Sequence, residues 1–127
     1  MKGLIAATIT LALSCLVAAD VRAETLSLTA GEIVDAFRAN PLAAKRRFAG
    51  KTIRLTGKVS AIKEGTGGAA FVQMGNGWWE GYIVELRTTE ADAIELVAEQ
   101  QATFSCTSVR NGERFDRDVH LSGCRKL

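Results

Sequence analysis

The feature that most restricts the fold is a long run of strict alternation at residues 52–61. Apolar or small side chains occupy every second position and polar side chains the positions between them, which is the period of a strand with one buried face. Gly57 breaks the row of larger apolar residues at its middle and predicts a bend or bulge where a sheet curls sharply. The sequence therefore predicts a curled sheet built around this strand.

Further strands are predicted on both sides of one helix, at about 69–74, 78–87, 102–106 and 119–124. A capping box at Thr89 and Asp92 predicts the helix, and its apolar side is expected to carry Ala91, Ile94, Val97 and Ala98. Residues 109–118, which precede the last strand, are predicted to form a polar loop.

Two short helices are predicted ahead of the long strand. Thr29 and Glu32 form a capping box at the start of the first helix. Asn40 and Pro41 then begin a second helix, because Asn is a good N-cap and Pro suits the first helical position. Residues 24–50 are therefore expected to be an N-terminal helical segment.

This order of elements predicts a mainly β fold, a five-stranded barrel of the OB (oligonucleotide- and oligosaccharide-binding) type. The barrel follows the N-terminal helical segment and has a helix between its third and fourth strands. Closure of a barrel leaves few free sheet edges, which suits so short a chain. We expect residues 24–50 and 51–127 to form a single domain. The alternative is an open α+β sheet with its helices on one face.

Residues 1–23 have the pattern of a secretory signal peptide. Lys2 gives a positive start, an apolar stretch follows at 4–19, and small or apolar residues precede a cleavage site after Ala23. We therefore expect a periplasmic or secreted protein whose mature form has no membrane span. Two alternatives remain, a retained N-terminal anchor and lipoprotein processing at Cys15.

Two cysteines, Cys106 and Cys124, remain after the predicted cleavage. An even count in an exported chain indicates one disulfide, and the alternatives are a metal-binding pair or two free thiols. Simple alternation places the two cysteines on opposite faces, so the disulfide requires a bulge near Gly123. No metal site and no cofactor are predicted, because the chain has a single His and no further Cys near this pair.

Several segments of the chain, taken together, resemble those of a known family. They are Asn40, Ala44-Lys45, Phe48-Ala49-Gly50-Lys51, Ile53-Arg54-Leu55-Thr56-Gly57-Lys58-Val59, Cys106 and Val119-His120-Leu121-Ser122-Gly123-Cys124. Over about residues 30–127 the chain resembles the tRNA-anti-like family of bacterial OB-fold proteins, many of them exported or lipoproteins. The resemblance implies the barrel and a binding role, and it implies no catalytic residues. Because export separates the protein from cytoplasmic tRNA, the family name is not taken as the function.

Aromatic side chains of the second and third predicted strands mark a candidate ligand surface. This face of an OB barrel commonly binds ligands, and aromatic rings there stack on bases or sugars. The predicted ligand-binding residues are Phe71, Trp78, Trp79 and Tyr82, together with the cations Arg54, Lys58, Arg110 and Arg114. The alternative is that both Trp side chains pack, one in the core and one beneath the first helix.

A group of basic residues continues from the second helix into the long strand, namely Lys45, Arg46, Arg47, Lys51, Arg54 and Lys58. A continuous patch of this kind attracts phosphate or an anionic membrane surface. The alternative is a solvated face on which these cations pair with carboxylates. The chain after residue 23 has 14 basic and 13 acidic residues, whereas polyanion binders normally show a clear basic surplus.

Together these patterns predict a non-catalytic binding module whose ligand is a small molecule, an oligosaccharide or a protein. Single-stranded nucleic acid, bound through the same face, is the alternative. A hydrolase that uses His120 is a third hypothesis, since Asp118 and Ser122 share its strand face. That spacing is a weak signal, and nothing in the sequence indicates an oxyanion site.

Overall fold

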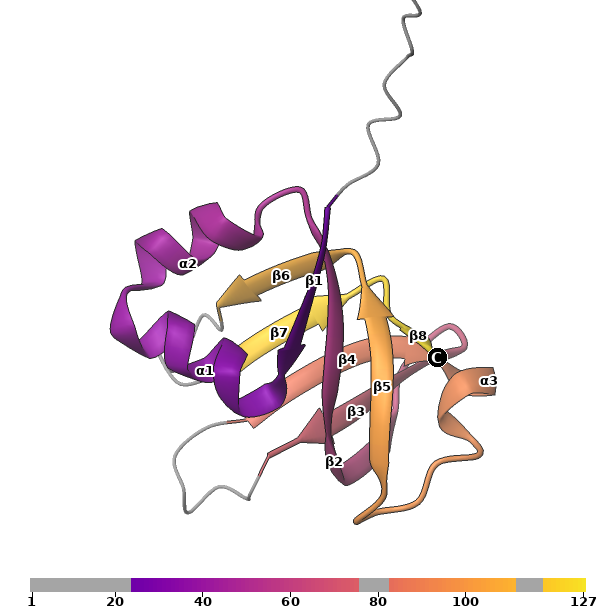
Figure 1. Ribbon diagram of the computed structural model, residues 1–127. Coiled ribbons are helices and arrows are strands. Elements are labelled where there is room, and N and C mark those ends of the chain that lie inside the picture. The colour runs from indigo at the N-terminus through magenta and orange to yellow at the C-terminus, as the bar shows by residue number, and fades with distance from the viewer. Residues whose placement is uncertain (1–23, 76–82, 112–117) are drawn as a thin grey trace, which may run out of the picture.

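The computed structural model describes residues 24–75, 83–111 and 118–127. Within these ranges, eight strands form a curled sheet with three helices beside it (Figure 1). The strands are β1 (Thr25–Thr29), β2 (Thr52–Glu64), β3 (Ala69–Met74), β4 (Ile83–Thr89), β5 (Gln101–Cys106), β6 (Ser108–Asn111), β7 (Asp118–Ser122) and β8 (Arg125–Lys126). The helices are α1 (Ala30–Ala39), α2 (Pro41–Phe48) and α3 (Glu90–Ala93). The predicted mainly β fold is confirmed.

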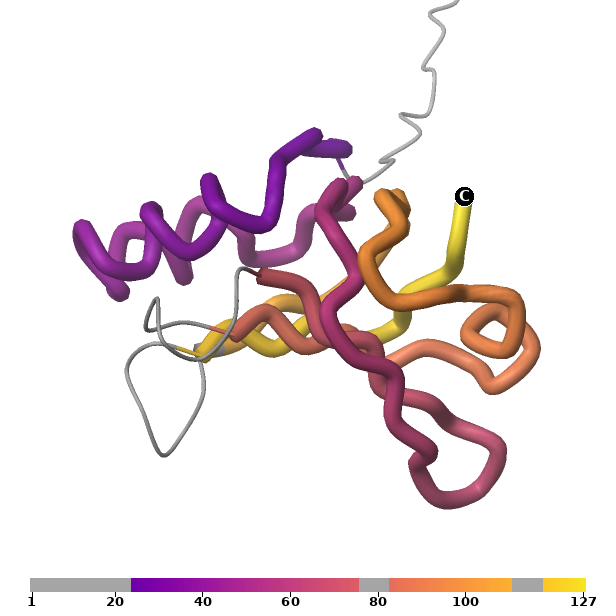
Figure 2. Tube along the Cα trace, turned by 90° about the horizontal axis from the view of Figure 1, so that it is seen from below, coloured from indigo at the N-terminus to yellow at the C-terminus, as the bar shows by residue number. Residues whose placement is uncertain are grey.

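Strand β2 connects the two parts of the sheet because it pairs with three other strands. Its first half lies between β1 and β5, and its second half pairs with β3. From β3 the sheet continues through β4 and β7 to β6. Strand β6 follows β5 in the chain with only Thr107 between them, so the chain itself ties the two sides of the curl together (Figure 2).

Gly57 lies where β2 changes partner, since β2 pairs with β5 before Val59 and with β3 from that residue onward. A β-carbon at position 57 would stand 2.8 Å from Sδ of Met74 and 3.1 Å from Cβ of Ala30. The missing side chain therefore lets β3 and the start of α1 close over β2. The predicted irregularity lies slightly further on, where the register with β3 shifts between Val59 and Ala61.

One hydrophobic core joins the sheet to the N-terminal helices. Its largest fully buried side chains come from α1 and five strands: Ile33, Val34, Ile53, Leu55, Val59, Val72, Met74, Val84, Leu86, Phe104, Val119 and Leu121. The rings of Phe37 and Phe48, with centroids 5.7 Å apart, join α1 to α2. The predicted caps at Thr29 and Asn40 begin these helices. Among the described helices, none has the length and apolarity that a membrane crossing requires.

The strand count differs from the predicted five. Strand β1 begins the segment that was expected to be helical, and β6 begins the segment that was expected to be a polar loop. The last predicted strand corresponds to β7, which ends before Gly123 (φ of 63°), and β8 follows beyond the predicted bounds. These strands have two to five residues, and their places depend on pairing with distant segments, which local alternation does not reveal.

Helix α3 is shorter than the sequence pattern predicts. Ile94 and Val97 were placed on its apolar side but are 74% and 64% exposed. The Glu99 amide donates to the Val59 carbonyl at 2.7 Å, and the Val59 amide donates to the Gln100 carbonyl at 2.8 Å. These hydrogen bonds draw the chain out of the helix and onto β2, and this tertiary pairing overrides the helical pattern.

Cys106 and Cys124 form the predicted disulfide, with their Cα atoms 4.0 Å apart. Strand β5 pairs with β8 at Ser105 and Arg125, and the two cysteines occupy the next step of that register. Gly123 brings Cys124 to the correct side by its left-handed backbone conformation, so the predicted bulge is not needed. The bond excludes the alternatives of a metal-binding pair and free thiols.

Reduction of the disulfide is expected to lower the free energy of unfolding by about 3 kcal/mol in the chain-entropy model, because the bond closes a loop over 18 sequence positions. For a domain of this size, that loss lowers Tm by about 10 °C or more, measured by circular dichroism. The intact mass should also rise by two hydrogen atoms on reduction. An unchanged mass would show that the bond is absent.

Gly123→Ala is expected to destabilise the fold by about 2 kcal/mol or more, because the left-handed backbone disfavours a side chain and the added β-carbon would clash with Oγ1 of Thr107. Gly67→Ala is the matched control, since Gly67 has φ of 65° but nothing within 4 Å of the added carbon. Urea unfolding should give the larger loss for Gly123→Ala. Equal losses would mean that the contact with Thr107 is unimportant.

Candidate ligand-binding face

Side chains that point away from the core on β3, β4, β6, β7 and the end of β2 form one continuous surface, here named the outer face. Val72, Val84 and Val119 are buried, so the residues that alternate with them point outward. The outer face includes Lys63, Phe71, Gln73, Glu85, Arg87, Arg110, Asp118, His120 and Ser122. It therefore collects one aromatic ring and several charged groups from five strands.

The strand register arranges these side chains in two rows across the sheet. The first row is, in order, Gln73, Glu85, His120 and Arg110. The second row is Lys63, Phe71 and Arg87. Residues opposite one another on neighbouring strands have Cβ atoms about 5 Å apart, so each member of a row is a direct neighbour of the next. The second row places the Phe71 ring between two cations.

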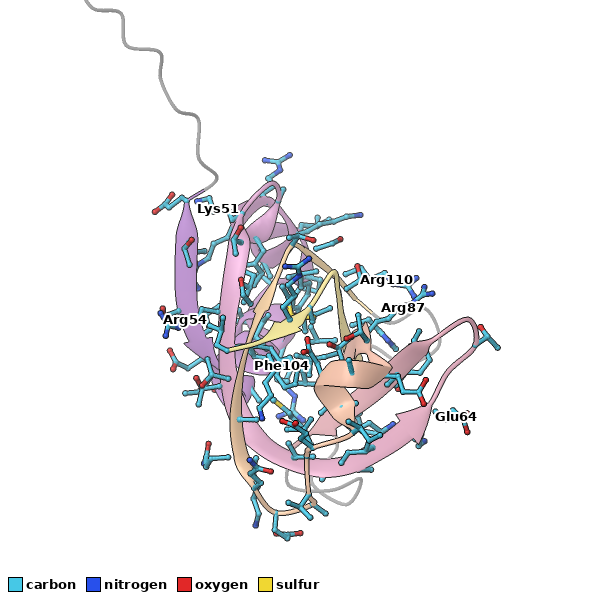
Figure 3. All side chains as sticks on the ribbon, turned by 90° about the vertical axis from the view of Figure 1, so that its right-hand side faces the viewer. Lys51, Arg54, Glu64, Arg87, Phe104 and Arg110 are labelled. Atoms are coloured by element: carbon cyan, nitrogen blue, oxygen red, sulfur yellow. A yellow bond between two sulfur atoms is a disulfide. The ribbon has the colours of Figure 1, made fainter. Side chains whose placement is uncertain are left out.

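A depression of about 340 Å³ lies in this surface, lined by Phe71, Glu85, Arg87, Arg110, His120, Leu121 and Ser122. Arg87 comes from β4 and Arg110 from β6, and Figure 3 shows both side chains extending toward the same side of the molecule. The curl of the sheet thus brings together two arginines that are far apart in the sequence.

Glu85 is engaged by its own neighbours on the outer face. Its Oε2 accepts a hydrogen bond of 3.2 Å from Nε2 of Gln73, and its Oε1 lies 3.5 Å from Nδ1 of His120. Arg87 and Lys63 form no ion pair with any residue in the part of the chain that the structure describes. The carboxylate is therefore held by polar neighbours, while two cations beside Phe71 keep their charge available.

An aromatic ring between cations is suited to a ligand that carries both an anionic group and a flat or apolar group. A guanidinium binds phosphate or carboxylate through paired, charge-assisted hydrogen bonds. An exposed ring offers a stacking surface to a base or a sugar. Phe71 is half-buried, so part of its ring is accessible for this purpose.

The structure brings together two of the residues that the sequence predicted, Phe71 and Arg110. Arg54 extends on the opposite side of the molecule from Arg110 (Figure 3), beside a separate depression of about 200 Å³. Lys58 forms an ion pair of 2.5 Å with Glu99. The remaining predicted ligand residues lie outside the described residues: Trp78, Trp79, Tyr82 and Arg114.

The basic group predicted from the second helix to the long strand is divided in the structure. Lys51 pairs with Glu24 at 3.2 Å and Lys58 pairs with Glu99. The other members are exposed and form no ion pair with a described residue: Lys45, Arg46, Arg47 and Arg54. Within the described residues, the alternative in which the cations pair with carboxylates therefore holds for Lys51 and Lys58 and not for the other four.

Arg87 and Lys63 are members of the outer face that the sequence analysis did not select. Each lies in an alternating strand at a polar position, but many exposed residues share that property. Their distinguishing feature is that both stand opposite Phe71 on neighbouring strands. That relation depends on strand register, which a single sequence does not specify.

His120 lies in the depression, where Glu85 is its charged neighbour. In the described part of the chain, no hydrogen bond links it to Asp118 or Ser122, the residues that spacing placed beside it. The hypothesis of a hydrolase centred on His120 therefore gains no supporting contact from the geometry.

Comparison with known proteins places the chain in a family. The model of the tRNA-anti-like family matches residues 12–115. No curated protein matches the sequence. A solved structure of similar fold is a "putative nucleic acid-binding lipoprotein" from Klebsiella pneumoniae, with 18% identity and a TM-score of 0.64 over 81% of this chain and 92% of that one.

A second similar structure is a "putative aspartyl-tRNA synthetase" from Leishmania major, with 16% identity and a TM-score of 0.51. The match covers 89% of this chain but 22% of that one, so the chain corresponds to about a fifth of the synthetase. At these identities the likeness concerns the fold. The match of the family model over most of the chain shows that the protein belongs to the tRNA-anti-like family.

Proposed function

We propose that the protein is a non-catalytic binding module of the OB type that holds an anionic ligand on its outer face. The OB assignment is supported by the consecutive antiparallel strands β2, β3 and β4, and by the parallel pairing of β4 with β7. Strands β5 and β6, joined through Thr107, act as one bent strand that pairs with β2 and with β7. Helix α3 lies between β4 and β5, where the predicted barrel has its helix.

The observation that carries the proposal is the placement of Phe71 among Lys63, Arg87 and Arg110 on one face. A surface that served only solubility would mix charges of both signs. Of the two carboxylates on the outer face, Glu85 is already held by Gln73 and His120, and Asp118 lies at the start of β7 opposite Ile83, away from the row that contains Phe71. The cations beside the ring are therefore the groups that meet a ligand.

Single-stranded nucleic acid is the ligand that the comparisons favour. The Klebsiella protein is described as nucleic acid-binding, and the Leishmania protein as a tRNA synthetase. A nucleotide has the combination that the outer face suits, a flat base for Phe71 and a phosphate for the nearby arginines. Trp78, Trp79 and Tyr82 directly precede β4 in the sequence, and we include them in the proposed ligand surface.

Export forms part of the proposal. Residues 1–23 have the pattern of a secretory leader, and the similar Klebsiella protein is described as a lipoprotein. We propose that the chain from Glu24 onward acts as a single domain outside the cytoplasm. Its ligand is then an extracytoplasmic nucleic acid or another anion that presents a ring.

Arg87→Ala and Phe71→Ala are each expected to weaken binding of a labelled single-stranded oligonucleotide by about tenfold, because one removes a phosphate contact and the other a stacking surface. Fluorescence anisotropy measures the affinity. Arg54→Ala is the matched control, since it removes an arginine from the opposite side of the molecule, and should change the affinity less than about twofold. If all three variants bind equally well, the outer face is not the binding surface.

Polyphosphate and the oligonucleotide should respond differently to Phe71→Ala. Polyphosphate has no ring, so its affinity should stay within about twofold while that of the oligonucleotide falls. The affinity for either polyanion should decrease with salt, with a shallow slope that reflects about two or three phosphate contacts. If the native chain binds neither polyanion at low salt, the proposed anionic ligand class is excluded.

A further inference from the structure

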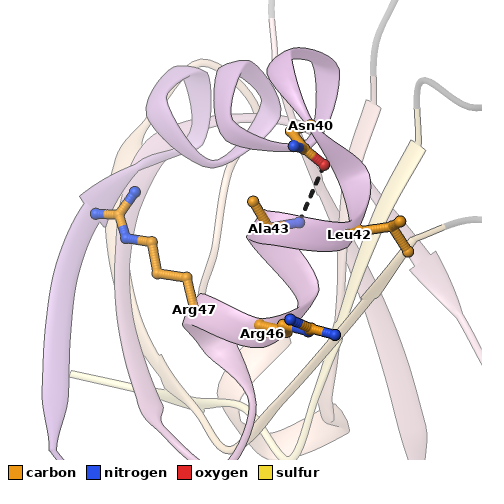
Figure 4. Close-up of a pocket in the computed structure, with 5 residues that line it drawn as sticks. All are labelled: Asn40, Leu42, Ala43, Arg46 and Arg47. Atoms are coloured by element: carbon orange, nitrogen blue, oxygen red, sulfur yellow. Dashed lines mark hydrogen bonds between the residues drawn. The ribbon is translucent and has the colours of Figure 1, made fainter.

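A second exposed surface, distinct from the outer face, lies on α2. We name it the α2 patch and define it as Leu42, Lys45, Arg46 and Arg47. Leu42 is 74% exposed, although the helix has a buried side formed by Ala44 and Phe48. Figure 4 shows the shallow depression of about 610 Å³ that Leu42, Arg46 and Arg47 line together with Asn40 and Ala43. A large apolar side chain is thus presented to solvent among cations.

The geometry of α2 is fixed, so the patch keeps its orientation relative to the fold. Oδ1 of Asn40 accepts a hydrogen bond of 3.1 Å from the Ala43 amide and caps the start of the helix. At the other end, the Phe48 ring packs against Phe37, and the Arg47 guanidinium lies 5.2 Å from the Phe48 centroid. Because Leu42 and Arg46 are four residues apart, they share one face of the helix.

The charge of the α2 patch is not neutralised by the described residues. Helix α2 contains no acidic residue, and none of its three cations forms an ion pair with a described residue. Lys51 and Lys58, by contrast, each have a glutamate partner. The patch therefore carries three positive charges, while the chain after residue 23 as a whole is nearly neutral.

The described chain begins beside the end of α2. The Lys51 amide donates to the Phe48 carbonyl at 3.2 Å, so Lys51 lies one turn beyond the helix. Lys51 also pairs with Glu24, and the Thr52 amide donates to the Glu24 carbonyl at 3.0 Å. Figure 1 shows the start of β1 and the end of α2 at the same end of the molecule. Glu24, where the described chain begins, therefore lies close to the end of α2.

We propose that the α2 patch lies against an anionic phospholipid surface. Cations close to such a surface each strengthen binding by roughly fivefold, and an exposed leucine adds contact with the acyl boundary. A leader, anchor or lipid attached ahead of Glu24 would act at the same end of the molecule, so the two attachments would reinforce one another. Docking through α2 leaves the outer face, on other elements, to its own ligand.

The test measures cosedimentation of the chain from Glu24 to Leu127 with two kinds of vesicle; this chain contains the whole core that the described residues form. Vesicles of equal parts phosphatidylglycerol and phosphatidylcholine should bind it at low ionic strength, and vesicles of phosphatidylcholine alone should not. Lys45→Glu with Arg46→Glu should reduce binding at least tenfold, and Leu42→Ser at least threefold. Arg47 is left unchanged because it contacts Phe48.

Arg54→Glu with Arg125→Glu is the matched control, since it changes net charge equally at exposed positions outside α2. The affinity of this control for anionic vesicles should be within about threefold of the affinity of the native chain. Equal losses in the two double variants would show a general charge effect and overturn the proposal, as would no binding to anionic vesicles. A Lys45→Glu and Arg46→Glu variant that binds vesicles normally but loses oligonucleotide binding would assign the patch to nucleic acid instead.

Discussion

The pairing of β2 with three other strands is the constraint from which the rest of the structure follows. A strand of 13 residues is longer than one partner can cover, so β2 pairs with β1 and β5 first and with β3 afterwards. The change of partner requires close contact at Gly57, where Met74 and Ala30 leave no room for a side chain. The curl that results lets β4 meet β7 and lets β6 return to the sheet.

The curl also generates the outer face. Phe71, Arg87 and Arg110 belong to three strands, and they line one depression because the sheet bends continuously from β2 to β6. In a flat sheet, β6 would continue outward from β5 and could not pair with β7. The disulfide between Cys106 and Cys124 ties β5 to the end of β7 and so stabilises the far side of the curl. Fold and proposed binding surface are therefore consequences of one arrangement.

Local signals in the sequence were sufficient for the helices at the N-terminus and for the longer strands. Thr29 and Asn40 cap α1 and α2 because their side-chain oxygens accept hydrogen bonds from backbone amides three residues further on. These bonds need no tertiary partner. The pairing of the two cysteines followed from their number and the predicted compartment. Strands β1, β6 and β8 were not predicted, because short strands form only where a distant partner exists. The length of helix α3 was overestimated for a related reason, since the backbones of Glu99 and Gln100 form hydrogen bonds with β2.

The candidate site could be predicted in part. An aromatic residue on an alternating strand indicates Phe71, but only the register shows that Lys63 and Arg87 stand on either side of it. Arg54 was grouped with Arg110 by charge, whereas the two extend on opposite sides of the molecule. Charge and residue type are properties of a sequence, while the sharing of a surface is a property of strand order and register.

The most direct measurement is an NMR titration of the isotopically labelled chain with a short single-stranded oligonucleotide. Binding through the outer face predicts chemical-shift changes concentrated at Phe71, Arg87, Arg110 and His120, with Arg54 and the residues of α2 unaffected. Changes centred on α2 or on β1 and β5 would contradict the assignment of this surface. The absence of any change at about 1 mM oligonucleotide, a concentration that detects a Kd of about 1 mM, would contradict it as well.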